Sequence, residues 1–160
     1  MNKPSIILFV ALWLTSFAVP AYAANSIRVN GEFTANVDFA TLSLTPVGAN
    51  CLLKVDGSLV FTGTLEGVAI GTTKALVFAP CEDVAVTPPG TFKDVFRSKL
   101  EFLGAVNGQP ATADLTYFGV TEVGGQIKAK FLLKNGLNGV IKVDAIVAVG
   151  GSYRGFVKLD

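Results

Sequence analysis

The feature that most constrains this chain is a series of short alternating segments in its C-terminal half. Between residues 99 and 160, apolar and polar side chains alternate, and Asn-Gly or Gly-Gly pairs separate the segments. Asn107-Gly108 is the clearest case, because an Asn-Gly pair between alternating segments favours the type I′ turn of a β-hairpin. Such short connections join antiparallel neighbours, since a parallel pair needs a crossover of about a dozen residues or more.

The same alternation continues upstream and predicts an all-β fold. An Asp56-Gly57 pair is interpreted as a further hairpin turn. Eight antiparallel strands with short hairpin turns are typical of a closed barrel, which is either filled by side chains or holds one small ligand. The predicted strands cover residues 52–55, 58–66, 73–79, 96–105, 111–118, 126–133, 140–149 and 152–159.

The period of two assigns side chains to the two faces of each strand. Phe131 and Val143 are expected inside, whereas Lys130, Lys142 and Asp144 are expected outside together with Lys128. An apolar lumen with a few hydroxyl groups is typical of a small-molecule site, and it is equally typical of a packed core. The candidate pocket residues are Phe61, Phe102, Tyr117, Phe131, Tyr153 and Ser98.

The N-terminus has the pattern of a secretory signal peptide. A positive residue, Lys3, precedes an apolar stretch over residues 6–19, and Ala21-Tyr22-Ala23 forms a small-x-small cleavage site. We therefore expect residues 1–23 to be removed and the mature protein to be secreted or periplasmic. Residues 24–50 are the least regular part and are predicted to be an N-terminal edge segment. Residues 51–160 are predicted to form the barrel domain.

Cys51 and Cys81 are the only two cysteines of the chain. In an exported protein an even pair of cysteines is most simply one disulfide. A pair of free thiols is the alternative, but a catalytic cysteine usually needs a neighbouring base such as histidine, and the chain has none. The sequence therefore predicts a Cys51–Cys81 bridge.

Charge and composition exclude several classes of function. Without histidine, the commonest metal ligand and general base is missing, so no metal and no cofactor are predicted. Beyond Lys3, twelve basic and twelve acidic side chains remain. Because no basic run interrupts this balance, neither nucleic acid nor a membrane is expected as a partner of the mature chain. An outer-membrane barrel is disfavoured because the predicted strands are short and the C-terminal residue is not aromatic.

A pattern of turn glycines and strand aromatics extends over roughly residues 58–160. Its elements are Phe102-x-Gly104, Val106-x-Gly108, Tyr117-x-Gly119, Gly124-Gly125, Gly136-Leu137-x-Gly139 and Gly150-Gly151-Ser152-Tyr153-x-Gly155. In this pattern the chain resembles the allene oxide cyclase barrel-like family, which includes the dirigent proteins and small bacterial proteins. The resemblance implies a calycin-like barrel.

The resemblance also implies a possible activity. Plant allene oxide cyclases use a carboxylate and a positioned water in a hydrophobic cavity to guide ring closure of an epoxide. In this chain, alternation points Glu66, Glu101, Asp114 and Asp144 outward, so no catalytic residue is carried over, and the acidic pocket residues of dirigent proteins are not matched either. The leading hypothesis is a secreted barrel that binds a small apolar molecule or has a structural role. The alternative is a cofactor-free isomerase or cyclase that acts by confining its substrate.

Overall fold

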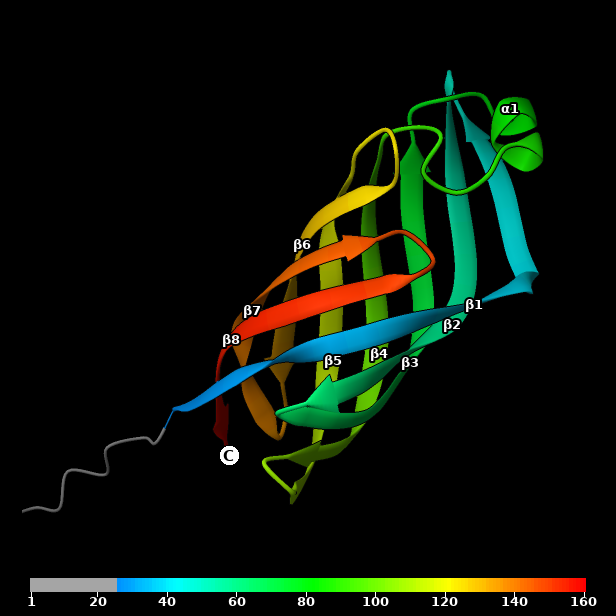
Figure 1. Ribbon diagram of the computed structural model, residues 1–160. Helices are drawn as coiled ribbons and strands as arrows, with labels where there is room; N and C mark the ends of the chain where they lie inside the picture. Colours follow the sequence, from blue (N-terminus) through cyan, green and yellow to red (C-terminus); the bar gives the residue numbers. More distant parts are fainter. Residues whose placement is uncertain (1–25) are drawn as a thin grey trace, which may run out of the picture.

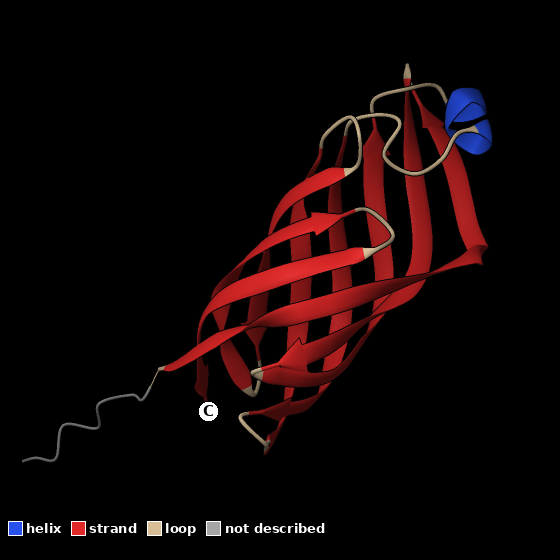
Figure 2. Ribbon diagram, viewed as in Figure 1, coloured by secondary structure: helices blue, strands red, loops and turns tan. Residues whose placement is uncertain are grey.

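The computed structural model describes residues 26–160, which fold into a β-barrel with one short helix (Figures 1 and 2). The predicted signal peptide and the expected mature N-terminus at Ala24 lie outside the described residues. The elements in chain order are β1 (Ile27–Val47), β2 (Asn50–Gly63), β3 (Leu65–Val77), α1 (Cys81–Val86), β4 (Asp94–Val106), β5 (Gln109–Thr121), β6 (Gln126–Lys134), β7 (Leu137–Ile146) and β8 (Gly150–Leu159). No helix in residues 26–160 has the length and apolar character needed to cross a membrane.

The eight strands form a closed antiparallel barrel, which confirms the predicted fold class. Each strand pairs with the next in sequence, and β8 pairs with the first part of β1 to close the barrel. The predicted turn at Asn107-Gly108 joins β4 to β5, and both residues have the positive φ values, 50° and 75°, that a type I′ turn requires.

The N-terminal boundary of the barrel differs from the prediction. Instead of forming a separate edge segment within residues 24–50, the chain from Ile27 to Val47 is a complete barrel strand that pairs with both β2 and β8. Asp56-Gly57 is not a turn but lies inside β2, where β1 and β3 pair on either side of it. The structure therefore has the predicted number of eight strands but a different set. It contains β1, which is not among the predicted strands, and the predicted strands at 52–55 and 58–66 are replaced by the single strand β2.

The reason for a glycine at position 57 is close contact between strands. A Cβ atom at Gly57 would lie 2.5 Å from the carbonyl oxygen of Asn36 on β1. A glycine is therefore required at this position by the close approach of the neighbouring backbone. In the sequence, however, the Asp-Gly pair has the pattern typical of a turn.

One end of the barrel is filled by aromatic rings, among them those of Phe33, Phe61, Phe102 and Phe131 from four strands. Phe131 lies 5.4 Å from Phe33 and 5.5 Å from Phe61 between ring centroids, and Phe102 lies 5.6 Å from Phe61 in an edge-to-face arrangement. Such geometries stabilise aromatic pairs beyond the burial of their area. This half of the lumen is therefore a packed core.

Tyr153 of β8 closes the filled end. Its hydroxyl accepts a hydrogen bond from the Leu65 amide at 2.9 Å and lies 3.0 Å from the Thr62 carbonyl oxygen, to which it can donate. Gly31 leaves room for this hydroxyl, because a Cβ atom there would lie 2.5 Å from it. The tyrosine thus reaches over Gly31 of β1 and ties β8 to the turn between β2 and β3.

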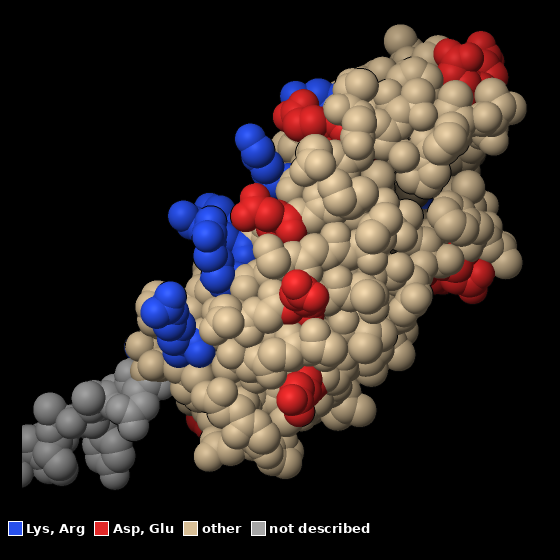
Figure 3. All heavy atoms as spheres, viewed as in Figure 1, with Lys and Arg blue, Asp and Glu red and all other residues tan. Residues whose placement is uncertain are grey.

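The predicted register of the C-terminal strands is confirmed. Lys128, Lys130, Lys142 and Asp144 are exposed, whereas Phe131 and Val143 are buried. The same register also collects cations that are distant in sequence, because Lys142 of β7 lies directly opposite both Lys130 of β6 and Arg154 of β8. Basic side chains accordingly gather along one side of the molecule (Figure 3). A search for basic runs misses such a row, since strand pairing creates it.

Candidate functional site

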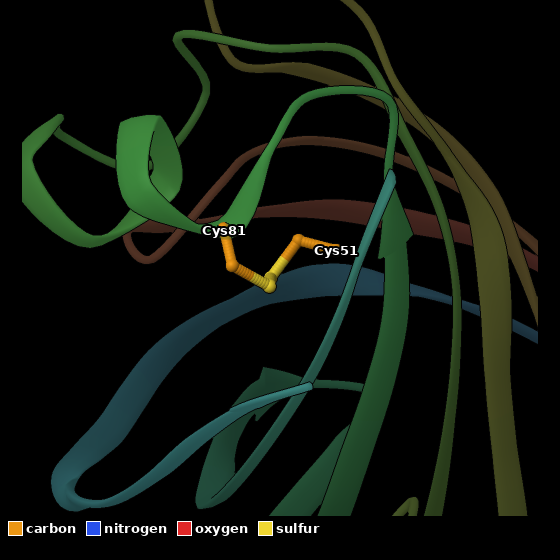
Figure 4. Close-up of a disulfide and its surroundings, with 2 residues drawn as sticks. All are labelled: Cys51 and Cys81. Carbon is orange, nitrogen blue, oxygen red and sulfur yellow. A yellow bond between two sulfur atoms is a disulfide. The ribbon is translucent and has the colours of Figure 1, made fainter. Parts of the chain in front are cut away.

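A disulfide between Cys51 and Cys81 holds α1 beside one end of the barrel (Figure 4). The bridge is as predicted, with the two Cα atoms 4.8 Å apart. It joins the start of β2 to the first residue of α1, and Cys51 packs with Ala75, Val77 and Ala79 in a small buried cluster. The segment that follows α1 is thereby kept at the mouth of the barrel.

This end of the barrel contains a cavity of about 340 Å³. Leu59, Leu100 and Ile127 contribute to its wall from three strands, and residues of α1 and of the 87–92 segment complete the wall from outside the sheet. On one side the barrel wall ends earlier, because the pairing of β8 with β1 stops at Thr34. Beyond this residue β1 continues with β2 as its one strand partner (Figure 1). Phe39 and Leu42 of this continuing part of β1 also line the cavity.

Asp94, the first residue of β4, places a carboxyl group in the cavity wall. Every second residue at the start of β4, namely Asp94, Phe96 and Ser98, faces the cavity. Asp94 lies directly opposite Thr121 of β5. Thr121 is 1% exposed and faces the carboxyl group from β5. Among the described residues, Asp94 Oδ1 is the one buried side-chain oxygen or nitrogen atom that has no hydrogen-bond partner.

Burial in this largely apolar wall raises the pKa of Asp94 to about 6, although the neighbouring Thr121 opposes the shift. Desolvation penalises the charged carboxylate, and no neighbouring cation compensates for it. At neutral pH the group is therefore mainly ionised and incompletely paired. Carboxylates in this condition occur often at functional sites.

Hydroxyl groups line the inner part of the cavity. Ser98 and Thr73 are 2.7 Å apart and hydrogen-bonded to each other, and Tyr117 lies opposite Ser98 on β5. The Tyr117 ring packs 4.8 Å from Phe96 and 4.7 Å from Phe131, so it separates the cavity from the aromatic core. Burial raises the pKa of Tyr117 above its ordinary value, which keeps its hydroxyl protonated and able to donate.

The charged side chains of the cavity wall are both acidic. Among the described residues that line the cavity, Asp56 and Asp94 carry charge, and neither lysine nor arginine contributes to the wall. Asp56 is exposed and accepts a hydrogen bond from Thr72. Within residues 26–160 no group of three His, Cys, Asp or Glu side chains is arranged to hold a metal ion.

The structure divides the predicted pocket residues between two regions. Tyr117 and Ser98 line the cavity, as expected. Phe61, Phe102, Phe131 and Tyr153 instead belong to the packed end of the barrel and are not among the residues that line the cavity. The Tyr153 hydroxyl is hydrogen-bonded to backbone groups of Leu65 and Thr62.

The sequence pattern does not identify Asp94 or Thr121 as site residues. The predicted strand begins at residue 96, so Asp94 falls in the preceding connection and has no assigned face. The signal was nevertheless present, because the inward parity of Phe96, Ser98 and Leu100 extends to Asp94 when the strand is lengthened by two residues. Strand ends are the least reliable part of such a pattern.

The raised pKa of Asp94 makes a prediction for stability. Asp94→Asn should increase the free energy of unfolding at pH 7.5 by about 1–2 kcal/mol, a value reduced for the partial solvation of the carboxyl group. Because the folded pKa lies above the unfolded value of 3.8, the wild type loses stability through this group as pH rises from about 4 to about 6. The gain from Asn should therefore shrink as pH falls and vanish near pH 3, where Asp94 is protonated in both the folded and the unfolded state. Urea unfolding of both proteins at pH 7.5 and 3.0 measures this, and a variant less stable at both values would contradict it.

Comparison with known proteins supports the architecture. No family model matches the chain, and no curated protein matches it. Among solved structures, the chain is similar to a protein with unknown function from the DUF3224 family of Shewanella oneidensis MR-1, with 16% sequence identity and a TM-score of 0.57. The match covers 85% of this chain and 98% of that chain. At this identity the likeness shows the fold alone, and the resemblance to the allene oxide cyclase barrel-like family stays a prediction.

Proposed function

We propose that the barrel binds a small, largely apolar molecule in the cavity beside α1. The observation that carries this proposal is the cavity itself, whose volume of about 340 Å³ falls at the lower end of the range of about 300–1,000 Å³ typical of small-molecule sites. Its composition also fits, since apolar side chains form most of the wall and a few groups, among them Asp94, Ser98 and Tyr117, provide hydrogen bonds. A purely structural barrel has no need of such a space.

The packed half of the barrel favours binding by providing a rigid base for the cavity. Tyr117 forms part of this base and is held between Phe96 and Phe131. The disulfide restrains the opposite wall through α1. A site that exists before the ligand arrives loses little conformational freedom on binding.

A thermal-shift screen with terpenoids, phenolics and fatty acids tests the proposal. A ligand present at about a hundred times its Kd should raise Tm by roughly 5–10 °C, because it binds the folded state alone. Ala75→Phe, which places a ring in the cavity wall, should abolish that shift. Val140→Phe adds the same ring on the exposed face of β7 and should leave the shift unchanged. The absence of a shift with every compound would leave a structural barrel.

Cofactor-free isomerisation or cyclisation is the second candidate, and Asp94 is the observation that favours it. A carboxylate with a pKa of about 6 in an apolar cavity is close to the optimum for a general base at neutral pH. Confinement of a flexible substrate against Tyr117 and Phe96 would supply the orientation. Turnover of an unstable epoxide that falls in Asp94→Asn, while the ligand-induced Tm shift persists, would favour this candidate over binding alone.

A further inference from the structure

We infer that the molecule held in the cavity carries a protonated amine, and that the N–H groups of this amine bind Oδ1 of Asp94. The inference rests on the proposed function and specifies its ligand class as an apolar body with one cationic head group. It also makes Asp94 the residue that determines specificity.

The hydrogen bonds of Asp94 give the first argument. Thr121 faces the carboxyl group from the neighbouring strand β5. Oδ1 of Asp94 is nevertheless buried and has no hydrogen-bond partner among the described residues. An unpaired buried acceptor costs free energy, and the cost is larger for a charged group. A ligand that donates to Oδ1 recovers this free energy, whereas one without a donor leaves the oxygen unpaired.

The distribution of charge gives the second argument. Lys93, next to Asp94 in the chain, pairs instead with Glu122, and their charged atoms are 3.0 Å apart and partly exposed. The described cavity wall contains Asp56 and Asp94 but no cation. A carboxylate ligand would therefore meet like charges, and an amine would supply the missing positive charge.

The spacing along β4 gives the size of the apolar body. Asp94 and Ser98 are four residues apart on the same face of the strand, which corresponds to about 13 Å between their Cα atoms. Ser98 and Tyr117 lie opposite each other at the inner part of the cavity, beside the aromatic core. A head group at Asp94 thus leaves room for one or two rings that extend toward Tyr117.

Among the groups near Asp94, burial raises the pKa of Asp94 itself and of Tyr117. The titratable side chains around it are Lys93 beside it on the chain, Glu122 next to Thr121, Tyr117 on β5, Asp56 on β2, and the exposed Glu82 and Asp83 on α1. Burial keeps Tyr117 protonated, and the chain contains no histidine. A transition in amine affinity near pH 6 is therefore assigned to Asp94.

Three naphthalene compounds that share one ring system and differ in head group test the inference. They are 1-naphthylmethylamine, 1-naphthalenemethanol and 1-naphthoate, and their intrinsic fluorescence reports binding to the purified protein. At pH 7.5 the wild type should bind the amine at least about tenfold more tightly than the acid. In Asp94→Asn this preference should fall to within about twofold. In the wild type at pH 5.0 the amine affinity should fall about tenfold, since Asp94 is then mainly protonated.

Two controls separate this inference from the proposed function. The alcohol should bind the wild type and Asp94→Asn about equally, which shows that the cavity is intact in the variant. Glu122→Gln removes a nearby carboxylate outside the cavity wall and should keep the preference for the amine. The pH series uses the wild type alone, so it decides the question even if the Asp94 variant fails to fold.

Other results of the naphthalene experiment would contradict the amine ligand, the role of Asp94 or the proposed binding function. Equal affinity for the three head groups, or tighter binding of the acid, refutes the amine and leaves the proposed function standing. An equal loss in Glu122→Gln refutes the specific role of Asp94. Failure of all three compounds to bind contradicts both the inference and the proposed function.

Discussion

Phe131→Ala is expected to lower the free energy of unfolding by about 3–5 kcal/mol. The Phe131 side chain is 0% exposed, and its ring contacts the rings of Phe33, Phe61 and Tyr117 at centroid distances between 4.7 and 5.5 Å. Truncation removes these contacts and leaves a hole that rings fixed by their own strands cannot close. Urea denaturation followed by far-ultraviolet circular dichroism measures the loss.

Phe156→Ala is the matched control for this prediction. Phe156 is also a phenylalanine in a C-terminal strand, but it lies on the outer face of β8 and is 58% exposed. Its truncation should change the free energy of unfolding by no more than about 0.5 kcal/mol. Similar losses at the two positions would mean that the inward and outward faces of the barrel are wrongly assigned.

Removing the disulfide is expected to have an effect of similar size. Cys51→Ala combined with Cys81→Ala should lower the free energy of unfolding by about 3–4 kcal/mol, because the bridge restrains the unfolded chain. The cysteines are 30 positions apart, so a loop of this length loses its closure in the variant. The Cys51 side chain is also buried, which adds to the loss when its sulfur is removed.

Reduction gives an independent check on the disulfide. Dithiothreitol should lower the Tm of the wild type toward that of the double variant and should leave the Tm of the variant unchanged. A double variant within about 1 kcal/mol of the wild type would show that α1 and β2 are held together by packing of the buried cluster around Ala75 and Val77 alone.

The sequence predicts those parts of the fold that depend on local chemistry. Asn107-Gly108 identifies a hairpin because its positive φ values are a property of the two residues themselves. The lysines at 128 and 130 and Phe131 define the faces of β6, since a shift by one residue would bury charge. The Asp56-Gly57 pair led to wrong predicted strand boundaries. Its glycine is required because the Asn36 carbonyl oxygen of a neighbouring strand comes close to it, and a local sequence pattern does not contain this contact.

For a related reason, the alternation pattern does not predict which inward-facing residues line the cavity. Phe96 and Phe131 both point inward by alternation, yet Phe131 lies in the packed core and Phe96 lines the cavity. The difference arises from what faces each ring across the lumen, and therefore from the register of all eight strands together. Asp94 shows the same limit, because its role depends on Thr121 opposite and on the segment after α1, which is held in place by a disulfide.

The Tyr153 closure limits how far the cavity extends into the barrel. Its hydroxyl is hydrogen-bonded to Leu65 and Thr62, and the aromatic rings behind it pack into the buried core at that end of the lumen. A ligand bound as proposed would lie on the α1 side of this core, where Phe39 and Leu42 of β1 contribute to the cavity wall. With a volume of about 340 Å³, the cavity would hold one small molecule at a time if it binds a ligand as proposed.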